Sequence, residues 1–231
     1  MNGSAHKKVK FHIIHNYTSL NKGWAAIVLS TVETIREIIP DADFTIESYY
    51  PEIDEKLYVP LGIKVVKKVI SSKTKAALLL IKALFWRILP RSSIIRPGLD
   101  ELGDLAHYYD SDIILDLAGD TLCVPFEDHN TTFGVQRNVL AMIGHSYLFV
   151  LCLLLRKPIV IYAQTVGPIG VTEPLIKMLL NRMSLITVRE ENSKQYLAEL
   201  GVNKPPVHLT RLRPRPAHRQ GSGRTSAILR K

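Results

Sequence analysis

Short apolar runs rich in β-branched residues recur along this chain, and the turn that follows each one is polar or contains glycine. Residues 113–117, 158–163 and 185–188 are three such runs. Stretches with helical spacing of apolar residues separate them, which is typical of parallel strands joined by helices. In an open parallel sheet, ligands bind beyond the carboxyl ends of the strands. The pattern therefore predicts an α/β chain with a small-molecule site along one edge of its sheet.

The predicted fold is a doubly wound, mostly parallel Rossmann-like sheet of about six strands, with helices as crossovers. The predicted strands are residues 9–16, 43–49, 112–117, 158–163, 185–188 and 206–210. The predicted helices are residues 24–39, 61–89 (two helices with a break near 71–72), 99–109, 138–155, 173–183 and 192–200. Gly201 is the expected stop of the last helix.

The charge of the chain is concentrated at its C-terminal end. Residues 211–231 contain six Arg, one Lys and no acidic residue, so they account for +7 of the net charge of +9. This segment is rich in Arg and Pro and has no apolar period, which predicts a disordered basic tail after a domain of residues 1–210. Because the domain is nearly neutral, no specific nucleic-acid partner is expected.

Cysteine usage and the N-terminus indicate a cytoplasmic location. Cys123 and Cys152 lie 29 positions apart in no metal-binding or disulfide pattern, so two reduced thiols and no metal are expected. The N-terminus leads into the first strand without a signal-peptide core.

Two apolar stretches raise the question of membrane contact. In residues 138–155 the unbroken apolar part, residues 147–155, is nine residues long. A spanning helix needs ~20, so this stretch predicts a helix buried against the sheet. Residues 75–89 interleave Lys82 and Arg87 with apolar residues. This stretch suits either burial or peripheral attachment to the inner face of a membrane.

Two turns near the start and middle of the chain carry candidate site residues. Asn21 and Gly23 open the first long helix, where a glycine lets backbone N–H groups approach an anion. A tight turn without a ligand is the alternative. Gly119 and Asp120 follow the third predicted strand, and a carboxylate there suits a base or a hydroxyl-binding group. Capping of the next segment is the alternative for Asp120.

Two later turns carry the other candidates. Gln164 and Gly167 follow the fourth predicted strand and offer an amide and a turn at the same edge. Arg189 follows the fifth and is suited to gripping a carboxylate or phosphate. Glu190 and Ser193 come directly after it, and the positive end of the next helix is an alternative reason for the acidic residue.

The histidines give no catalytic pattern. His12 and His15 are three apart on a predicted strand, so they are expected to face opposite sides, with His15 nearer the active edge. His129 and His145 are predicted to be structural or solvent-exposed.

With these turns in this order, the chain resembles the polysaccharide pyruvyl transferase family over residues 9–210. The matching segments are a Gly-Gly-Asp-like turn at residues 118–120 with Ala118 in place of the first glycine, a Gln-Ser-x-Gly-Pro-like turn at residues 164–168, a Thr-x-Arg-Glu-x-x-Ser segment at residues 187–193, and Asn21-x-Gly23 before a helix.

The resemblance implies the N-terminal domain of a GT-B-like two-domain enzyme. It implies transfer of a pyruvyl group from phosphoenolpyruvate to sugar hydroxyls of a cell-surface glycan, with a glycan or lipid-linked saccharide as acceptor and no cofactor. By the same resemblance, Arg189 and Asp120 are the expected catalytic residues, on the donor and on the acceptor hydroxyl. The expected substrate-binding residues are Asn21, Gly23, Gly119, Gln164, Gly167, Glu190 and Ser193.

Members of that family continue into a second Rossmann-like domain, whereas here the basic segment follows residue 210. A truncation or a change of reading frame is the expectation, with weak or no activity for the chain alone. Two other functions stay open: a nucleotide-sugar glycosyltransferase of GT-B type, and a non-catalytic remnant bound to anionic membrane or glycan.

Overall fold

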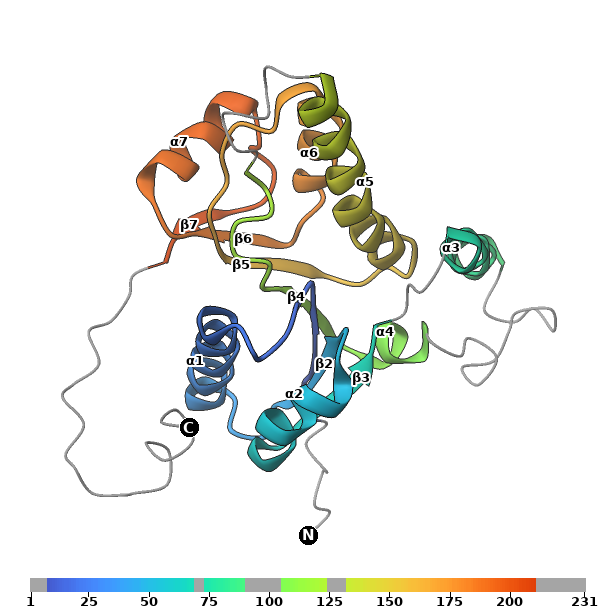
Figure 1. Cartoon of the computed structure of the whole chain (residues 1–231), viewed down its shortest axis with the longest axis vertical. Helices are drawn as coiled ribbons and strands as arrows, with labels where there is room; N and C mark the ends of the chain where they lie inside the picture. The colour runs from blue at the N-terminus through green and yellow to red at the C-terminus, as the bar shows by residue number, and fades with distance from the viewer. Residues whose placement is uncertain (1–7, 69–72, 90–104, 124–131, 211–231) are drawn as a thin grey trace, which may run out of the picture.

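A computed structural model describes residues 8–68, 73–89, 105–123 and 132–210 (Figure 1). These residues form an open, fully parallel sheet of seven strands in the order β3-β2-β1-β4-β5-β6-β7. The strands are β1 (Lys10–Ile14), β2 (Asp43–Ser48), β3 (Ile63–Lys67), β4 (Ile113–Asp116), β5 (Ile159–Gln164), β6 (Leu185–Val188) and β7 (Val207–Leu209). The predicted basic tail and His129 lie outside the described residues.

Helices connect the strands as crossovers, which confirms the predicted α/β, Rossmann-like class. They are α1 (Lys22–Ile38), α2 (Pro51–Tyr58), α3 (Lys73–Ile88), α4 (Ala106–Asp110), α5 (Thr132–Leu154), α6 (Glu173–Leu180) and α7 (Glu191–Leu200), with short 3-10 turns η1 (Val59–Leu61) and η4 (Gly170–Thr172).

The sheet has seven strands and not six, because the first part of a predicted helical segment is β3. We predicted two helices over residues 61–89, but only α3 lies in that range. Gly62 turns the chain with a φ of 70° after η1, and the Ile-Lys-Val-Val-Lys run that follows is β-branched and pairs with β2. β-branched residues pack well on a pleated surface, and that preference outweighed the apolar spacing. Helix α2, which begins at Pro51, was also not predicted.

Two apolar clusters hold the helices to the sheet. One joins residues of β1, β2 and β3 to α1 and α2 and includes Phe44, Ile46 and Tyr58. The other joins β4, β5 and β6 to α3, α5 and α6 and includes Phe149 and Ile176. The helices therefore cover opposite faces on the two sides of the β1–β4 pair, as α1 and α5 do in Figure 1.

Helix α5 is long and apolar enough to cross a membrane by length and composition alone. Its buried residues, which include His145, Phe149 and Cys152, instead pack in the core beside the sheet. This agrees with the prediction of a helix buried against the sheet. Cys152 and Cys123 are both free thiols.

Candidate active site

The candidate site lies where the order of the strands reverses. β1 and β4 are neighbours, but β1 is followed by β2 on one side and β4 by β5 on the other. Such a reversal leaves a crevice at the carboxyl ends of the two strands. Asp116 is the last residue of β4, and His15 directly follows β1. His15 has a φ of 58°, which is uncommon for a residue with a side chain.

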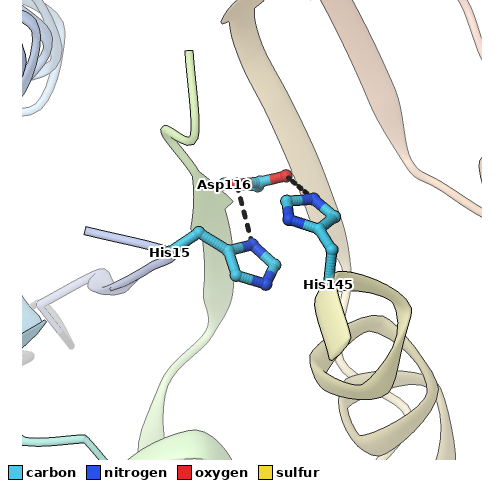
Figure 2. A group of neighbouring side chains, drawn as sticks. All are labelled: His15, Asp116 and His145. Atoms are coloured by element: carbon cyan, nitrogen blue, oxygen red, sulfur yellow. Dashed lines mark hydrogen bonds and ion pairs between the residues drawn. The ribbon is translucent and has the colours of Figure 1, made fainter. Parts of the chain in front are cut away.

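A buried carboxylate contacts two imidazoles at this point (Figure 2). Nδ1 of His15 is 3.0 Å from Oδ1 of Asp116, and Nε2 of His145 is 3.4 Å from Oδ2. The backbone N–H of Ala118 also donates to Oδ1, at 3.1 Å. The side chains of the two histidines are at most 8% exposed and that of Asp116 is fully buried. The site therefore combines a shielded carboxylate, hydrogen-bonded through Oδ1, with an imidazole of His145 that faces its second oxygen.

The carboxylate determines where the proton of His15 lies. An ionised carboxylate only accepts hydrogen bonds, so Nδ1 of His15 carries a proton and Nε2 of that ring is left as a bare acceptor. Nε2 of His145 faces the second carboxylate oxygen, and Nδ1 of that ring shares a hydrogen bond with the hydroxyl of Thr121 at 3.3 Å. Nε2 of His15 has no hydrogen-bond partner among the described residues. The arrangement therefore presents one buried imidazole nitrogen with a free lone pair.

Burial sets the charge state of this cluster. Burial, followed by the neighbouring His145, lowers the pKa of His15 to about 4, against the opposing effect of Asp116. Burial on its own raises the pKa of Asp116, but the two histidines outweigh it and hold that pKa below its ordinary value. His15 is therefore neutral near pH 7, and its Nδ1–H donates to the ionised carboxylate of Asp116.

Two imidazoles and a carboxylate are also a donor set that divalent transition metals take. The rings of His15 and His145, however, stack face to face, with centroids 3.7 Å apart and planes at 15°. Imidazole lone pairs lie in the plane of the ring, so those of two stacked rings run side by side and do not converge on one ion. The geometry fits a hydrogen-bonded cluster better than a metal centre.

The turn after β4 connects this cluster to Arg189. Thr121 contacts His145 at one end of the turn, as described above. At the other end Gly119 has a φ of 81°, and a Cβ there would lie 3.1 Å from Nη2 of Arg189. A glycine is required at this position both for the backbone conformation and for the close approach of the guanidinium.

Arg189 is held in place by the end of β5. Its backbone N–H donates to the carbonyl of Gln164 at 3.2 Å, and its Nε donates to the carbonyl of Ala163. The side chain is exposed, and its Nη atoms have no hydrogen-bond partner in the part of the chain that the structure describes. A positioned guanidinium with free donors can bind an anionic ligand.

The predicted turns after β4 and β5 bind each other. Thr165 N–H donates to the carbonyl of Gly119 at 2.8 Å, and Gly167 N–H donates to the carbonyl of Leu122 at 3.1 Å. A Cβ on Gly167 would lie 2.6 Å from Sγ of Cys123, so only glycine fits there. The structure therefore brings three predicted turns together, because the Arg189 turn lies against the same pair.

Gln164 is buried, and its side-chain amide lacks hydrogen-bond partners among the described residues. Neither its amide oxygen nor its amide nitrogen has a hydrogen-bond partner among the described residues. A buried unsatisfied amide costs about 1–3 kcal/mol, so a native structure keeps one only for a reason such as a ligand or an ordered water.

Glu190 and Ser193 hold the turn after β5. Thr165 Oγ1 donates to Glu190 Oε1 at 3.0 Å, and Val166 N–H donates to Oγ of the buried Ser193 at 2.9 Å. Ser193 Oγ in turn donates to the second oxygen of Glu190 at 3.3 Å. In this structure both side chains position the turn from the start of α7.

Asp120 is exposed on its turn, beside Cys123. Its carboxylate has no hydrogen-bond partner within the described ranges and faces solvent. Burial, with Asp120 and Glu190 as lesser causes, raises the pKa of the Cys123 thiol. The thiol therefore stays protonated near neutral pH, and the exposed carboxylate is the group available to an incoming hydroxyl.

Asn21 and Gly23 begin α1 at the same edge of the sheet, but no interaction joins them to the Arg189 group within the described residues. Asn21 Oδ1 accepts the N–H groups of Gly23 and Trp24 at 3.0 and 3.3 Å. Asn21 is therefore the N-cap of α1, a role that the sequence analysis did not predict. The loop before it is fixed by the buried Asp54, which accepts from Ser19 N–H at 2.7 Å and Thr18 Oγ1 at 3.3 Å.

Comparison with known proteins decides the family. The family model for polysaccharide pyruvyl transferase matches residues 21–210. The chain belongs to the polysaccharide pyruvyl transferase family. The match includes the three turns that meet around Arg189 as well as Asp116 and His145. No curated protein matches this pyruvyl transferase family member.

Sequence reasoning missed Asp116, His145 and Asp54 as parts of the site. His145 is not solvent-exposed as one of the two predicted options had it, since only 6% of its side chain is accessible. The predicted strand included His15, but β1 ends one residue before it, and His15 contacts the carboxylate of Asp116. As predicted, it does not pair with His12, which is fully buried on β1. The sequence offered one indication of this cluster, which is that Asp116 is a carboxylate at the end of an otherwise apolar strand.

Proposed function

We propose that this chain binds phosphoenolpyruvate at the carboxyl edge of β4, β5 and β6 and takes part in transfer of its pyruvyl group to sugar hydroxyls. The observation that carries the proposal is the convergence of three turns on Arg189, a cation with free donors. Membership of the family supports the reaction class. The exposed Asp120 and the unsatisfied Gln164 at the same edge support a polar ligand there.

The proposed reaction requires one group that binds the donor and others that transfer protons. In ketal formation the methylene carbon of phosphoenolpyruvate gains a proton and becomes a methyl group. The adjacent carbon, which bears the carboxylate, forms two C–O bonds to the sugar and loses its bond to phosphate. Of the two protons lost by the sugar hydroxyls, the balance gives one to the methylene carbon and one to phosphate. The reaction therefore needs a cation for the donor and groups that move two protons.

Arg189 is the proposed cation that binds the donor. Its guanidinium lies over the glycine turn at Gly119, where the carboxylate or phosphate of the donor can approach the backbone closely. Glu190 and Ser193 act indirectly, because they fix the turn that carries Gln164 and Thr165.

Asp120 and His15 are the proposed groups that transfer protons. The exposed carboxylate of Asp120 accepts a proton from an acceptor hydroxyl. His15, whose Nδ1 is hydrogen-bonded to Asp116 and whose buried Nε2 has no hydrogen-bond partner among the described residues, is the proposed second group that accepts a proton, at the carboxyl end of β1. Asp116 and His145 orient that ring and are positioning residues.

Titration calorimetry with phosphoenolpyruvate tests the proposal. The Arg189→Ala variant should bind at least about tenfold more weakly, because a hydrogen bond between charged groups contributes about 1.5–3 kcal/mol. Arg182→Ala is the matched control, since Arg182 is an exposed arginine between α6 and β6. Equal affinity of the Arg189 variant and the wild type contradicts the proposal. Preferential binding of a nucleotide-sugar over phosphoenolpyruvate favours the glycosyltransferase alternative.

A further inference from the structure

Helix α3 presents an apolar stripe to solvent. Four of its large apolar side chains are at least half exposed: Leu78, Ile81, Phe85 and Ile88. Their spacing of three, four and three residues places them along one face of the helix. Exposed apolar residues scattered singly are ordinary, but a continuous stripe indicates a surface that contacts something apolar.

The opposite face of α3 is anchored in the core, so the stripe points away from the domain. Leu79, Ala83 and Trp86 are buried, and the Trp86 ring packs against that of Tyr109 with centroids 4.6 Å apart. Tyr147 of α5 also donates its hydroxyl proton to the carbonyl of Ala76, at 2.8 Å. Figure 1 shows α3 on the outside of the molecule, beyond α5. The helix is therefore a fixed element that displays the stripe.

Basic residues border the stripe on both sides. By helical spacing, Lys75 and Lys82 flank it on one side and Arg87 on the other. Residues 57–99 contain nine Lys or Arg and no Asp or Glu, and α5 beside α3 contains no acidic residue either. An apolar stripe bordered by cations can bury its side chains among lipid acyl chains while the long basic side chains reach the headgroups.

We propose that α3 docks this protein on an anionic lipid bilayer, with the helix lying in the plane of the surface. The distribution of charge around the stripe favours an anionic bilayer over a second copy of the chain. A second copy of the chain, paired through the same stripe, would bring Lys75, Lys82 and Arg87 against their own counterparts, and like charges repel. Near an anionic leaflet each basic residue is attracted. This proposal does not depend on the proposed pyruvyl transfer.

Vesicle co-sedimentation of the full chain tests the docking surface. Vesicles of phosphatidylcholine alone are compared with vesicles of phosphatidylcholine and phosphatidylglycerol in equal amounts. The wild type should sediment with the anionic vesicles, and the variant with both Ile81→Glu and Phe85→Glu should bind at least about tenfold less, since two apolar anchors are lost. Ile38→Glu is the control, because Ile38 is 77% exposed on α1 and should leave binding unchanged.

A second variant separates this surface from the basic segment at residues 211–231, which is present in every protein tested. In Phe85→Trp, tryptophan fluorescence should be quenched further by vesicles of brominated anionic lipid, whereas Ile38→Trp should show no added quenching. Binding through the basic segment alone leaves both added tryptophans unquenched and overturns the proposal. Equal sedimentation of the wild type and the double variant overturns it as well, as does the absence of sedimentation by the wild type.

Discussion

Acidification should destabilise this protein through His15. The ordinary histidine pKa is 6.5, and burial lowers that of His15 to about 4 in the folded state. The unfolded chain therefore binds more protons than the folded one below pH 6.5, so the stabilisation is fully present above that pH and is lost as the pH falls toward 4. Linkage gives a loss of about 2 kcal/mol in the free energy of unfolding between pH 8 and pH 5.

Urea unfolding of the wild type and of His15→Gln at pH 8 and pH 5 measures this loss. The wild type should lose about 2 kcal/mol more than the variant over this interval, because the variant has no imidazole to protonate. The buried His12 contributes its own acid dependence to both proteins, so it cancels in the difference. His208→Gln, a change in an exposed histidine of β7, should follow the wild type. An identical pH dependence of the His15 variant and the wild type would refute the reasoning.

Three further substitutions test how the site is held. Gly119→Ala should cost about 1–2 kcal/mol in urea unfolding because of the positive φ, and calorimetry should show weaker phosphoenolpyruvate binding because the new Cβ displaces Arg189. Unchanged binding would contradict that contact. Gly167→Ala should destabilise by about 1–3 kcal/mol through overlap with Cys123, and clearly less in a Cys123→Ala background; equal costs in both backgrounds would exclude the overlap. Asp54→Ala should cost about 2 kcal/mol or more by urea unfolding, since several buried donors lose their acceptor; a loss below half of that would count against it.

The sequence predicted the elements with strong local signals. The strand predicted at residues 158–163 is β5 (Ile159–Gln164), and the predicted helix stop at Gly201, whose φ is 83°, is also confirmed. The convergence of the turns at Gly119, Gln164 and Arg189 was also predictable, because the carboxyl ends of parallel strands meet at one edge. The strand β3 was missed because its valines and lysines also fit a helical spacing.

The buried cluster could not be predicted in this way. His15 follows β1, Asp116 ends β4 and His145 lies in α5. The first and last are more than a hundred positions apart, and only the order of the strands brings the three together. Nothing in the local sequence of α5 distinguishes a histidine that faces a carboxylate from one that faces solvent. Tertiary packing brings these three side chains together, so no local sequence motif indicates the cluster.

The most direct test of the central claim is a crystal structure of this chain with phosphoenolpyruvate bound. We expect the ligand at the carboxyl edge of β4, β5 and β6, with its carboxylate or phosphate within hydrogen-bonding distance of the Arg189 guanidinium and close to the turn at Gly119. Phosphoenolpyruvate bound elsewhere, with the Nη atoms of Arg189 making no contact to it, would contradict the proposed binding site.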